Sequence, residues 1–280
     1  MPEDVITQSQ PQSDAHQSGY PAEGSREMMD AGVFYGRKKS KTNPKMKQFV
    51  LANRGGIEII NLQKTEDAME HAAGFVKEKI RNGGTALFVG AVPSADAKIT
   101  ELAKKYGFPY VTARWVGGTI TNFRNISKRI EYMKKLRTDF ATHALDKYTK
   151  KERLELEKEQ GRLEELIGGL EMMSREPDLL VIIDPVLHDT AVREAIVKKI
   201  PVVALGNVDV DPDLIDHLVP GNDKAKLSIE WFLGKIDKAI EEGLKEKAAK
   251  VAEDAAKKEK EAAVKDVVKE SPKESPKAAE

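Results

Sequence analysis

Cysteine is absent from this chain of 280 residues. No disulfide can therefore form, and thiol catalysis and cysteine-ligated zinc sites are excluded. Apolar runs are short, and none approaches the roughly 18 residues that a membrane-spanning helix needs. The segment beginning Met1-Pro2-Glu3-Asp4 has neither the basic nor the apolar region of a signal peptide. Together these absences predict a cytoplasmic protein with no membrane partner.

Motifs that mark common enzyme sites are also missing. The chain has no G-x-G-x-x-G, G-x-x-x-x-G-K-[ST] or G-x-S-x-G sequence, and its five histidines are scattered without metal-ligand spacing. We therefore expect no catalytic residues and no small-molecule substrate. One turn, Val89-Gly90 followed by Ala91 to Ser94, nevertheless has the strand-to-helix form that can hold a phosphate. An α/β enzyme that binds a phosphorylated small molecule or a nucleotide is the alternative.

The formal net charge is zero, but the charge is unevenly distributed. Residues 1–25 carry −4 and residues 241–280 carry −1, which leaves +5 on residues 26–240. Surface potential depends on charge density within about a Debye length, so local clusters matter more than the total. One segment has seven basic residues and no acid: Arg37, Lys38, Lys39, Lys41, Lys45, Lys47 and Arg54. Neighbouring aromatic residues, Phe34 and Tyr35, suit RNA binding, although a flexible solvated loop is the simpler alternative.

A second basic segment follows an apolar strand predicted at 108–111. It reads Arg114-Trp115-Val116-Gly117-Gly118-Thr119-Ile120-Thr121-Asn122-Phe123, and its glycine pair permits a turn that a Cβ would forbid. We expect Thr119 or Thr121 to cap a helix over about 119–137 with a basic outer face. A tight turn over a buried tryptophan is the alternative. The segment adds six candidate RNA-binding residues: Arg114, Trp115, Asn122, Arg124, Lys128 and Arg129.

The remaining pattern predicts an α/β fold. Apolar runs at 85–90, 109–111, 178–184 and 201–205 are typical of strands, and amphipathic helices are predicted at 65–81, 94–106 and 188–199. This alternation favours a three-layer αβα fold with a parallel sheet, flavodoxin-like or Rossmann-like. Two charged helices over about 119–173 interrupt it. Leucines seven residues apart at 156, 163 and 170 predict that they form an inserted, protruding coiled-coil hairpin.

Six aspartates near the expected carboxyl ends of strands are candidate ligands for Mg²⁺: Asp184, Asp189, Asp209, Asp211, Asp213 and Asp216. Mg²⁺ prefers hard oxygen ligands, and open α/β sheets place their ligands at this edge. The alternative is that these side chains cap helices and turns. We favour the alternative and expect no cofactor.

Eight motifs, taken in order, resemble a known family. They are NPKM, NLQKT, GGTALFVG, RWVGGTITNF, IIDP, IPVVAL, DPDLID and VPGND. The chain from about residue 27 to 240 is similar to the bacterial small-subunit ribosomal protein S-two family. The resemblance implies a non-enzymatic constituent of the small ribosomal subunit, with an α/β body and a protruding coiled-coil hairpin. It also implies binding to small-subunit ribosomal RNA and to neighbouring ribosomal proteins, and recruitment of the large messenger-binding ribosomal protein.

The sequence departs from the family pattern at several positions. Phe34-Tyr35-Gly36-Arg37 replaces histidines around the glycine, and Thr42 replaces a tryptophan before the NPKM motif. Ala91 to Ser94 lacks the family's lysines, and Val186-Leu187 replaces a basic residue after the IIDP motif. The resemblance therefore does not carry over contacts at these strand ends or a histidine-based ion site.

Three segments are expected along the chain. Residues 1–25 are predicted to be a disordered acidic tail, residues 26–240 an α/β ribosomal domain, and residues 241–280 a charged tail that passes from helix to disorder. We expect the two basic clusters to meet on one side of the domain and bind folded RNA. A scaffold protein that interacts through the helical hairpin alone is a third hypothesis.

Overall fold

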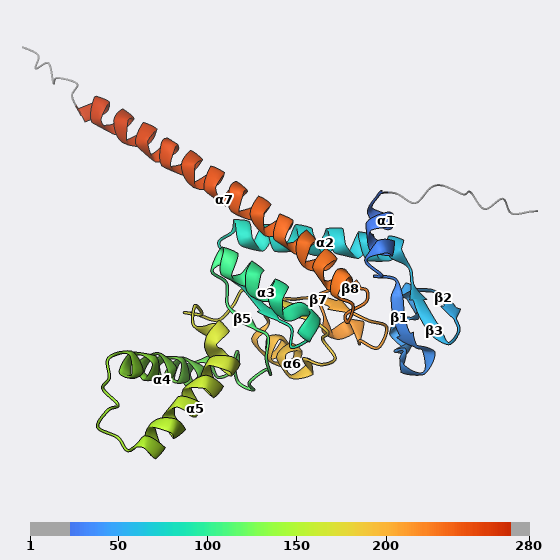
Figure 1. Ribbon diagram of the computed structural model, residues 1–280. Coiled ribbons are helices and arrows are strands. Elements are labelled where there is room, and N and C mark those ends of the chain that lie inside the picture. Colours follow the sequence, from blue (N-terminus) through green and yellow to red (C-terminus); the bar gives the residue numbers. More distant parts are fainter. Residues whose placement is uncertain (1–22, 270–280) are drawn as a thin grey trace, which may run out of the picture.

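A five-stranded parallel sheet forms the centre of the molecule (Figure 1). The computed structural model describes residues 23–269, with side chains for residues 25–250. Most of the predicted N-terminal tail, and residues 270–280 of the predicted C-terminal tail, lie outside the described residues. The sheet order is β5-β4-β6-β7-β8, which is the flavodoxin-like order 2-1-3-4-5. Its strands are β4 (Ala86–Val89), β5 (Tyr110–Val111), β6 (Leu179–Ile183), β7 (Val202–Gly206) and β8 (His217–Pro220).

Burial explains which strands were predicted. Every residue of β4, β6 and β7 is buried, because helices cover both faces, and these strands therefore appear as continuous apolar runs. The edge strand β8 was not predicted. Its first two residues, His217 and Leu218, are only partly buried, and it pairs with β7 alone.

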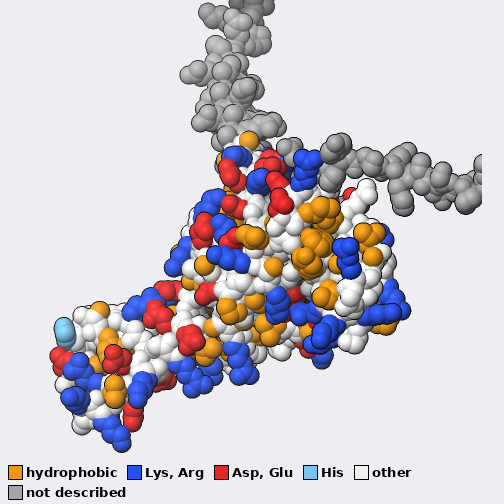
Figure 2. All heavy atoms as spheres, turned by 45° about the vertical axis from the view of Figure 1, so that its right-hand side comes forward, with side chains coloured by type: hydrophobic (Ala, Val, Ile, Leu, Met, Phe, Trp, Pro, Cys, Tyr) orange, Lys and Arg blue, Asp and Glu red, His pale blue; other side chains and the backbone are white. Residues whose placement is uncertain are grey.

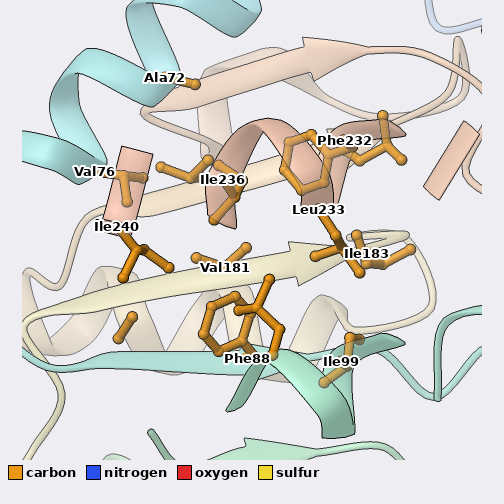
Figure 3. Packing of buried hydrophobic residues seen from close by; sticks show 14 of the residues in the cluster. Ala72, Val76, Phe88, Ile99, Val181, Ile183, Phe232, Leu233, Ile236 and Ile240 are labelled. Atoms are coloured by element: carbon orange, nitrogen blue, oxygen red, sulfur yellow. The ribbon is translucent and has the colours of Figure 1, made fainter. Parts of the chain in front are cut away.

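Helices cover both faces of the sheet, which confirms the predicted α/β class. One face is covered by α2 (Leu62–Arg81), α3 (Pro93–Tyr106) and the first half of α7 (Lys226–Lys269). In the close view, Phe232 and Ile236 of α7 lie over Val181 of β6 and Phe88 of β4 (Figure 3). The other face is covered by α6 (Asp189–Lys198) and by the bases of two further helices, α4 and α5.

A small antiparallel sheet lies beside the β8 edge of the large one. It consists of β1 (Tyr35–Lys38), β3 (Ile57–Ile60) and β2 (Val50–Arg54), in that order. β1 and β2 lie in the first basic segment, for which a flexible solvated loop was the alternative. This part of the chain also contains α1 (Glu23–Asp30) and two short 3-10 helices, η1 (Lys39–Lys41) and η2 (Pro44–Phe49).

Two helices extend from the opposite edge of the sheet. They are α4 (Phe123–Ala141) and α5 (Lys150–Ile167), followed by the 3-10 turn η3 (Gly168–Leu170). Ile126 and Ile130 of α4 are buried with Ile167 at the base of this arm. Farther out, Arg137 pairs with Glu164 at 2.7 Å. Figure 1 shows the arm pointing away from the sheet.

The last helix extends into the predicted C-terminal tail. Residues 241–280 were predicted to pass from helix to disorder, and α7 runs from Lys226 to Lys269. Ala, Lys and Glu dominate its second half and are among the best helix formers. Its later part projects from the body in Figure 1.

Candidate nucleic-acid interface

The first basic segment is folded against the body. Met46 is fully buried in η2 and packs with Ile60 and Val208. The side-chain oxygen of Asn43 caps η2 by accepting a hydrogen bond from the backbone amide of Lys45. The backbone amide of Asn43 donates to the Val208 carbonyl at 2.8 Å. The burial of Met46 and the backbone hydrogen bond of Asn43 therefore hold this segment against the body. A flexible solvated loop would make neither contact. Five of its predicted RNA-binding residues are exposed: Lys38, Lys39, Lys41, Lys47 and Arg54.

Two other basic residues of this segment are neutralised within the molecule. The Nε atom of Arg37 lies 2.7 Å from Asp209, and a terminal nitrogen lies 2.8 Å from Asp223. Lys45 lies 2.9 Å from Asp211 and also pairs with Asp213. Because the guanidinium of Arg37 is paired with these carboxylates, Arg37 links β1 to the large sheet and is not a free cation that could bind a phosphate. This corrects its assignment as an RNA contact.

The Arg37 cluster consists of Arg37, Asp184, Asp209 and Asp223. Its buried carboxylates are Asp184, which follows the central strand β6, and Asp223, which follows the edge strand β8. Asp223 is fully buried, and burial together with the charge of Asp184 raises the pKa of Asp223 to about 6, although Arg37 acts in the opposite direction. Lys224 forms a short ion pair with Asp184. The cluster thus occupies the edge where α/β sheets usually place ligands.

His188 occupies the turn that was the candidate phosphate site. Its Nε2 atom accepts a hydrogen bond from the Ala91 amide at 2.9 Å. Burial lowers the pKa of His188 to about 4, so the ring is neutral and able to accept. An N–H group that would bind a phosphate is therefore already used, which counts against the nucleotide alternative.

The remaining candidate metal ligands serve local structure. Asp211 caps the 3-10 helix η4 (Pro212–Leu214), and Asp216 accepts a hydrogen bond from the Val202 amide at 2.9 Å. Asp189 pairs with Arg193. Within the described part of the chain, no group of three or more His, Asp or Glu side chains is arranged to hold a metal ion.

Glu194 of α6 holds the second basic segment. Trp115 is 8% exposed, and its indole N–H donates to the Glu194 carboxylate at 3.1 Å. The same carboxylate accepts from the amides of Gly118, Ile120 and Thr121. Trp115 is thus part of the interior, which favours the buried-tryptophan alternative over its prediction as an RNA-binding residue.

The predicted threonine cap of α4 is wrong. The helix begins at Phe123, with Asn122 at the N-cap position but without a side-chain capping bond. The Thr119 hydroxyl donates to the Val116 carbonyl, and the Thr121 hydroxyl donates to Glu194. Glu194 was not among the residues predicted from the sequence. The available signal was a carboxylate on the helix face that Ala191 and Ala195 otherwise bury.

Exposed cations surround the Glu194-bound loop. Trp115 and Ile120 point inward, whereas the predicted RNA-binding residues on the outer side are exposed: Arg114, Asn122, Arg124, Lys128 and Arg129. In the space-filling view, Lys and Arg side chains lie along the lower border of both the body and the helical arm (Figure 2).

The two basic segments do not meet, and that prediction is wrong. The first lies beside the β8 edge, where Asn43 bonds to Val208, and the second leads into α4 near the β5 edge. β5 and β8 are the two outer strands of the sheet, so the first segment lies beside one outer strand and the second follows the other. Figure 1 shows β1 and α4 at opposite ends of the body.

Comparison with known proteins identifies the family. The model of the family described as ribosomal protein S2 matches residues 28–243, more than half of the chain. The chain belongs to the ribosomal protein S2 family. A relative from Thermus thermophilus, the small ribosomal subunit protein uS2, is 40% identical over 210 residues, which cover 75% of this chain and 82% of the relative. The protein of the same name from Corynebacterium glutamicum is 43% identical over 235 residues, which cover 82% and 89%.

Membership of the S2 family makes this chain a structural component of the small ribosomal subunit and a translation protein rather than an enzyme. The matched region includes both basic segments and the Arg37 cluster, and it ends within α7. Among residues 23–269, no helix combines the length and apolar character that crossing a membrane requires.

Proposed function

We propose that this S2-family chain binds small-subunit ribosomal RNA through two separate basic surfaces. The first surface, here called the platform, consists of Lys38, Lys39, Lys41, Lys47 and Arg54. The second, here called the loop–helix surface, consists of Arg114, Asn122, Arg124, Lys128 and Arg129. Residues 26–240 are the RNA-binding ribosomal domain in this proposal, and the chain from residue 241 is an extension of it.

The proposal rests on the unpaired Lys and Arg side chains of the two surfaces. The Lys and Arg side chains of both surfaces form no ion pair with any side chain of residues 25–250. On the helices of the opposite layer, by contrast, Lys77, Lys98 and Lys105 are each paired with a carboxylate. Unpaired cations gathered on a folded surface are suited to neutralising phosphates and releasing counterions. Lys45 is already paired with two aspartates and contributes less.

The separation of the two surfaces favours an extended, folded RNA over a short single strand. Such an RNA is recognised mainly by its shape and phosphates, so no base-specific code is required. Tyr35 is half-exposed beside the platform and its ring centroid lies 4.1 Å from that of Phe34. This pair offers a stacking surface for an unpaired base.

The arm formed by α4 and α5 serves a different purpose in this proposal. We propose that it is a coiled-coil hairpin that contacts a neighbouring ribosomal protein and helps to recruit the large messenger-binding one. Near its tip, Tyr148 and Leu154 are exposed, 43% and 51%, among charged residues. Exposed aromatic and aliphatic side chains on a projecting arm suit a protein partner better than phosphates.

Binding of the full chain to purified small-subunit RNA, measured as a function of salt, tests the proposal. The variant K38A/K39A/K41A removes three platform cations, and K77A/K98A/K105A removes three paired cations as a control with the same change in net charge. The platform variant should bind more weakly, with a shallower salt dependence, by roughly 0.9 in log–log slope for each lost phosphate contact. The control should bind like the parent chain.

Equal binding by both variants would overturn the proposal. Sedimentation of tagged protein from lysate provides a second test, since the protein should travel with small subunits and be released by ribonuclease or high salt. Thermal protection by a nucleotide but not by RNA would instead favour the enzyme alternative.

A further inference from the structure

We infer that Glu194 is the positioning residue of the loop–helix surface: its buried carboxylate sets the loop conformation that presents Arg114 and Arg124 to RNA. This inference rests on the proposed RNA-binding function and deepens it. Glu194 lies in α6, more than 70 positions along the chain from the loop that it holds, and its side chain points away from solvent.

The carboxylate is shared between two halves of one loop. Oε1 accepts from the Trp115 indole at 3.1 Å and from the Gly118 amide at 2.8 Å. Oε2 accepts from the Ile120 amide at 3.1 Å and from both the amide and the hydroxyl of Thr121 at 3.0 Å. Each oxygen is therefore bound from a different side of the glycine turn. The turn cannot open without breaking bonds at one oxygen or the other.

These bonds hold the turn that leads into α4. The helix begins at Phe123, and the amides that donate to Glu194, those of Gly118, Ile120 and Thr121, lie before it. Amides in a turn have no regular backbone partner, and Glu194 supplies an acceptor for three of them from a different element. Gly118 has φ +89°, a conformation that other residues rarely adopt, and it aims its amide at Oε1. Glu194 thus sets the conformation of the turn before α4.

Only an anionic acceptor fits this position. All five bonds come from N–H or O–H donors, and an ionised carboxylate accepts at both of its oxygens and donates at neither. Burial alone would raise the pKa of Glu194, but hydrogen bonds from Thr121, Gly118, Trp115 and Ile120 hold it below its usual value. A glutamine of the same shape would turn an NH₂ group toward two or three of these donors and leave them buried without a partner.

The buried contacts of the loop determine which of its side chains are exposed to solvent. Ile120 and Trp115 are held against the body, and so their neighbours Arg114 and Asn122 face outward, next to Arg124 at the start of the helix. Glu194 is 7% exposed and is therefore not an RNA contact itself. Its effect on binding must pass through residues that the loop positions, and the inference assigns that effect to Arg114 and Arg124.

A double-mutant cycle on the full chain tests this coupling. The variants are E194Q, R114A/R124A and the triple combination, and the probe is purified small-subunit RNA. We expect E194Q to weaken binding roughly tenfold and to make the salt dependence shallower by about one to two phosphate contacts. In the R114A/R124A background, E194Q should have little further effect, because the side chains that it positions are gone. Glu176→Gln, which alters an exposed carboxylate paired with Lys198, is the matched control and should bind normally.

The outcomes separate this inference from the proposed function. If R114A/R124A binds normally, RNA binding by this surface is disproved, and the inference with it. If R114A/R124A is weakened but E194Q is normal, or if the two effects simply add, Glu194 does not act through the arginines and the inference alone fails. Should E194Q not fold, Thr121→Val removes only the hydroxyl bond, and the same cycle with that variant decides the matter.

Discussion

The guanidinium of Arg37 lies 2.8 Å from the carboxylate of Asp223, although 186 positions separate the two residues in the chain. This ion pair joins β1 to the loop that follows the last strand of the large sheet. Asp184 and Asp209 lie within ion-pair distance of the same guanidinium. The Arg37 guanidinium therefore contacts carboxylates from three loops at one edge of the sheet, and Lys224 adds a second cation at Asp184.

Replacing Arg37 by methionine should destabilise the chain by about 3 kcal/mol at pH 7.5, because it leaves the buried Asp223 carboxylate without its cation. Burial raises the pKa of Asp223 to about 6, so at pH 5 the group is largely protonated and the same replacement should cost less. Urea unfolding at the two pH values measures the difference. Lys45→Met, in the exposed pair with Asp211, is the control and should change little at either pH. An Arg37→Met penalty that grows toward pH 5 would contradict the assignment.

His188 should make the folded state less stable as the pH falls. Its folded pKa is about 4, lowered by burial, and the ordinary value is 6.5, so between these values the unfolded chain binds more protons than the folded one. Stability from this group is complete above pH 6.5 and is lost as the pH falls toward 4, by up to about 3 kcal/mol. His188→Gln keeps an acceptor for the Ala91 amide but does not titrate. In urea unfolding, the His188→Gln variant should become more stable relative to the parent chain as the pH falls from 6.5 to 4. If the difference in free energy of unfolding between the two chains does not change with pH, the prediction is wrong.

Asp223 and His188 act in opposite directions over nearly the same pH range. For Asp223 the folded pKa is the higher one, so its contribution falls as the pH rises from about 4 to about 6. In the unmodified chain the two contributions largely offset one another. The contribution of one group to the free energy of unfolding can therefore be measured when the other group is replaced. The pH dependence of stability should be compared between variants and not taken from the parent chain alone.

Gly118→Ala should destabilise the chain by about 1 kcal/mol and weaken RNA binding. Gly118 has φ +89°, which a Cβ disfavours, and an added methyl group would lie 3.3 Å from the Cβ of Asn122. Gly117→Ala is a control from the same turn, since an added Cβ there meets nothing within 4 Å and its φ is not positive. Thermal unfolding and RNA binding of the pair provide the measurement. Equal effects of both replacements would show that the turn does not depend on the conformation of Gly118.

Removing the outer part of the α4–α5 arm should leave the domain folded. Arg137 and Glu164 are paired across the arm, so residues 139–162 can be replaced by a short glycine-rich linker. The buried residues Ile126, Ile130 and Ile167 stay in place. We expect an unfolding midpoint close to that of the parent and unchanged RNA binding, together with loss of the neighbouring ribosomal protein from reconstituted small subunits. Retention of that neighbour would contradict the role proposed for the arm.

Local patterns in the sequence were sufficient to predict much of the fold. β4, β6 and β7 could be located because strands covered on both faces are continuous apolar runs, and α2, α3 and α6 because each buries one face. The start of α4 could not be predicted in this way, because the turn before it is held by Glu194 of another helix and no threonine caps it. Nor could β8 be predicted, since it is short, only partly buried at its first two residues and stabilised by pairing with β7.

The sequence by itself determined the class of fold, the family and the presence of two basic segments, because each depends on residues close together in the chain. Only the tertiary structure decided which cations are free. Lys38 is unpaired within the described residues while Arg37, its neighbour, is bound by distant carboxylates. It also decided that the two basic segments lie apart, since strand order places β5 and β8 at opposite edges of the sheet. Charge pairing and strand order depend on contacts between residues far apart in the chain, about which local composition carries no information.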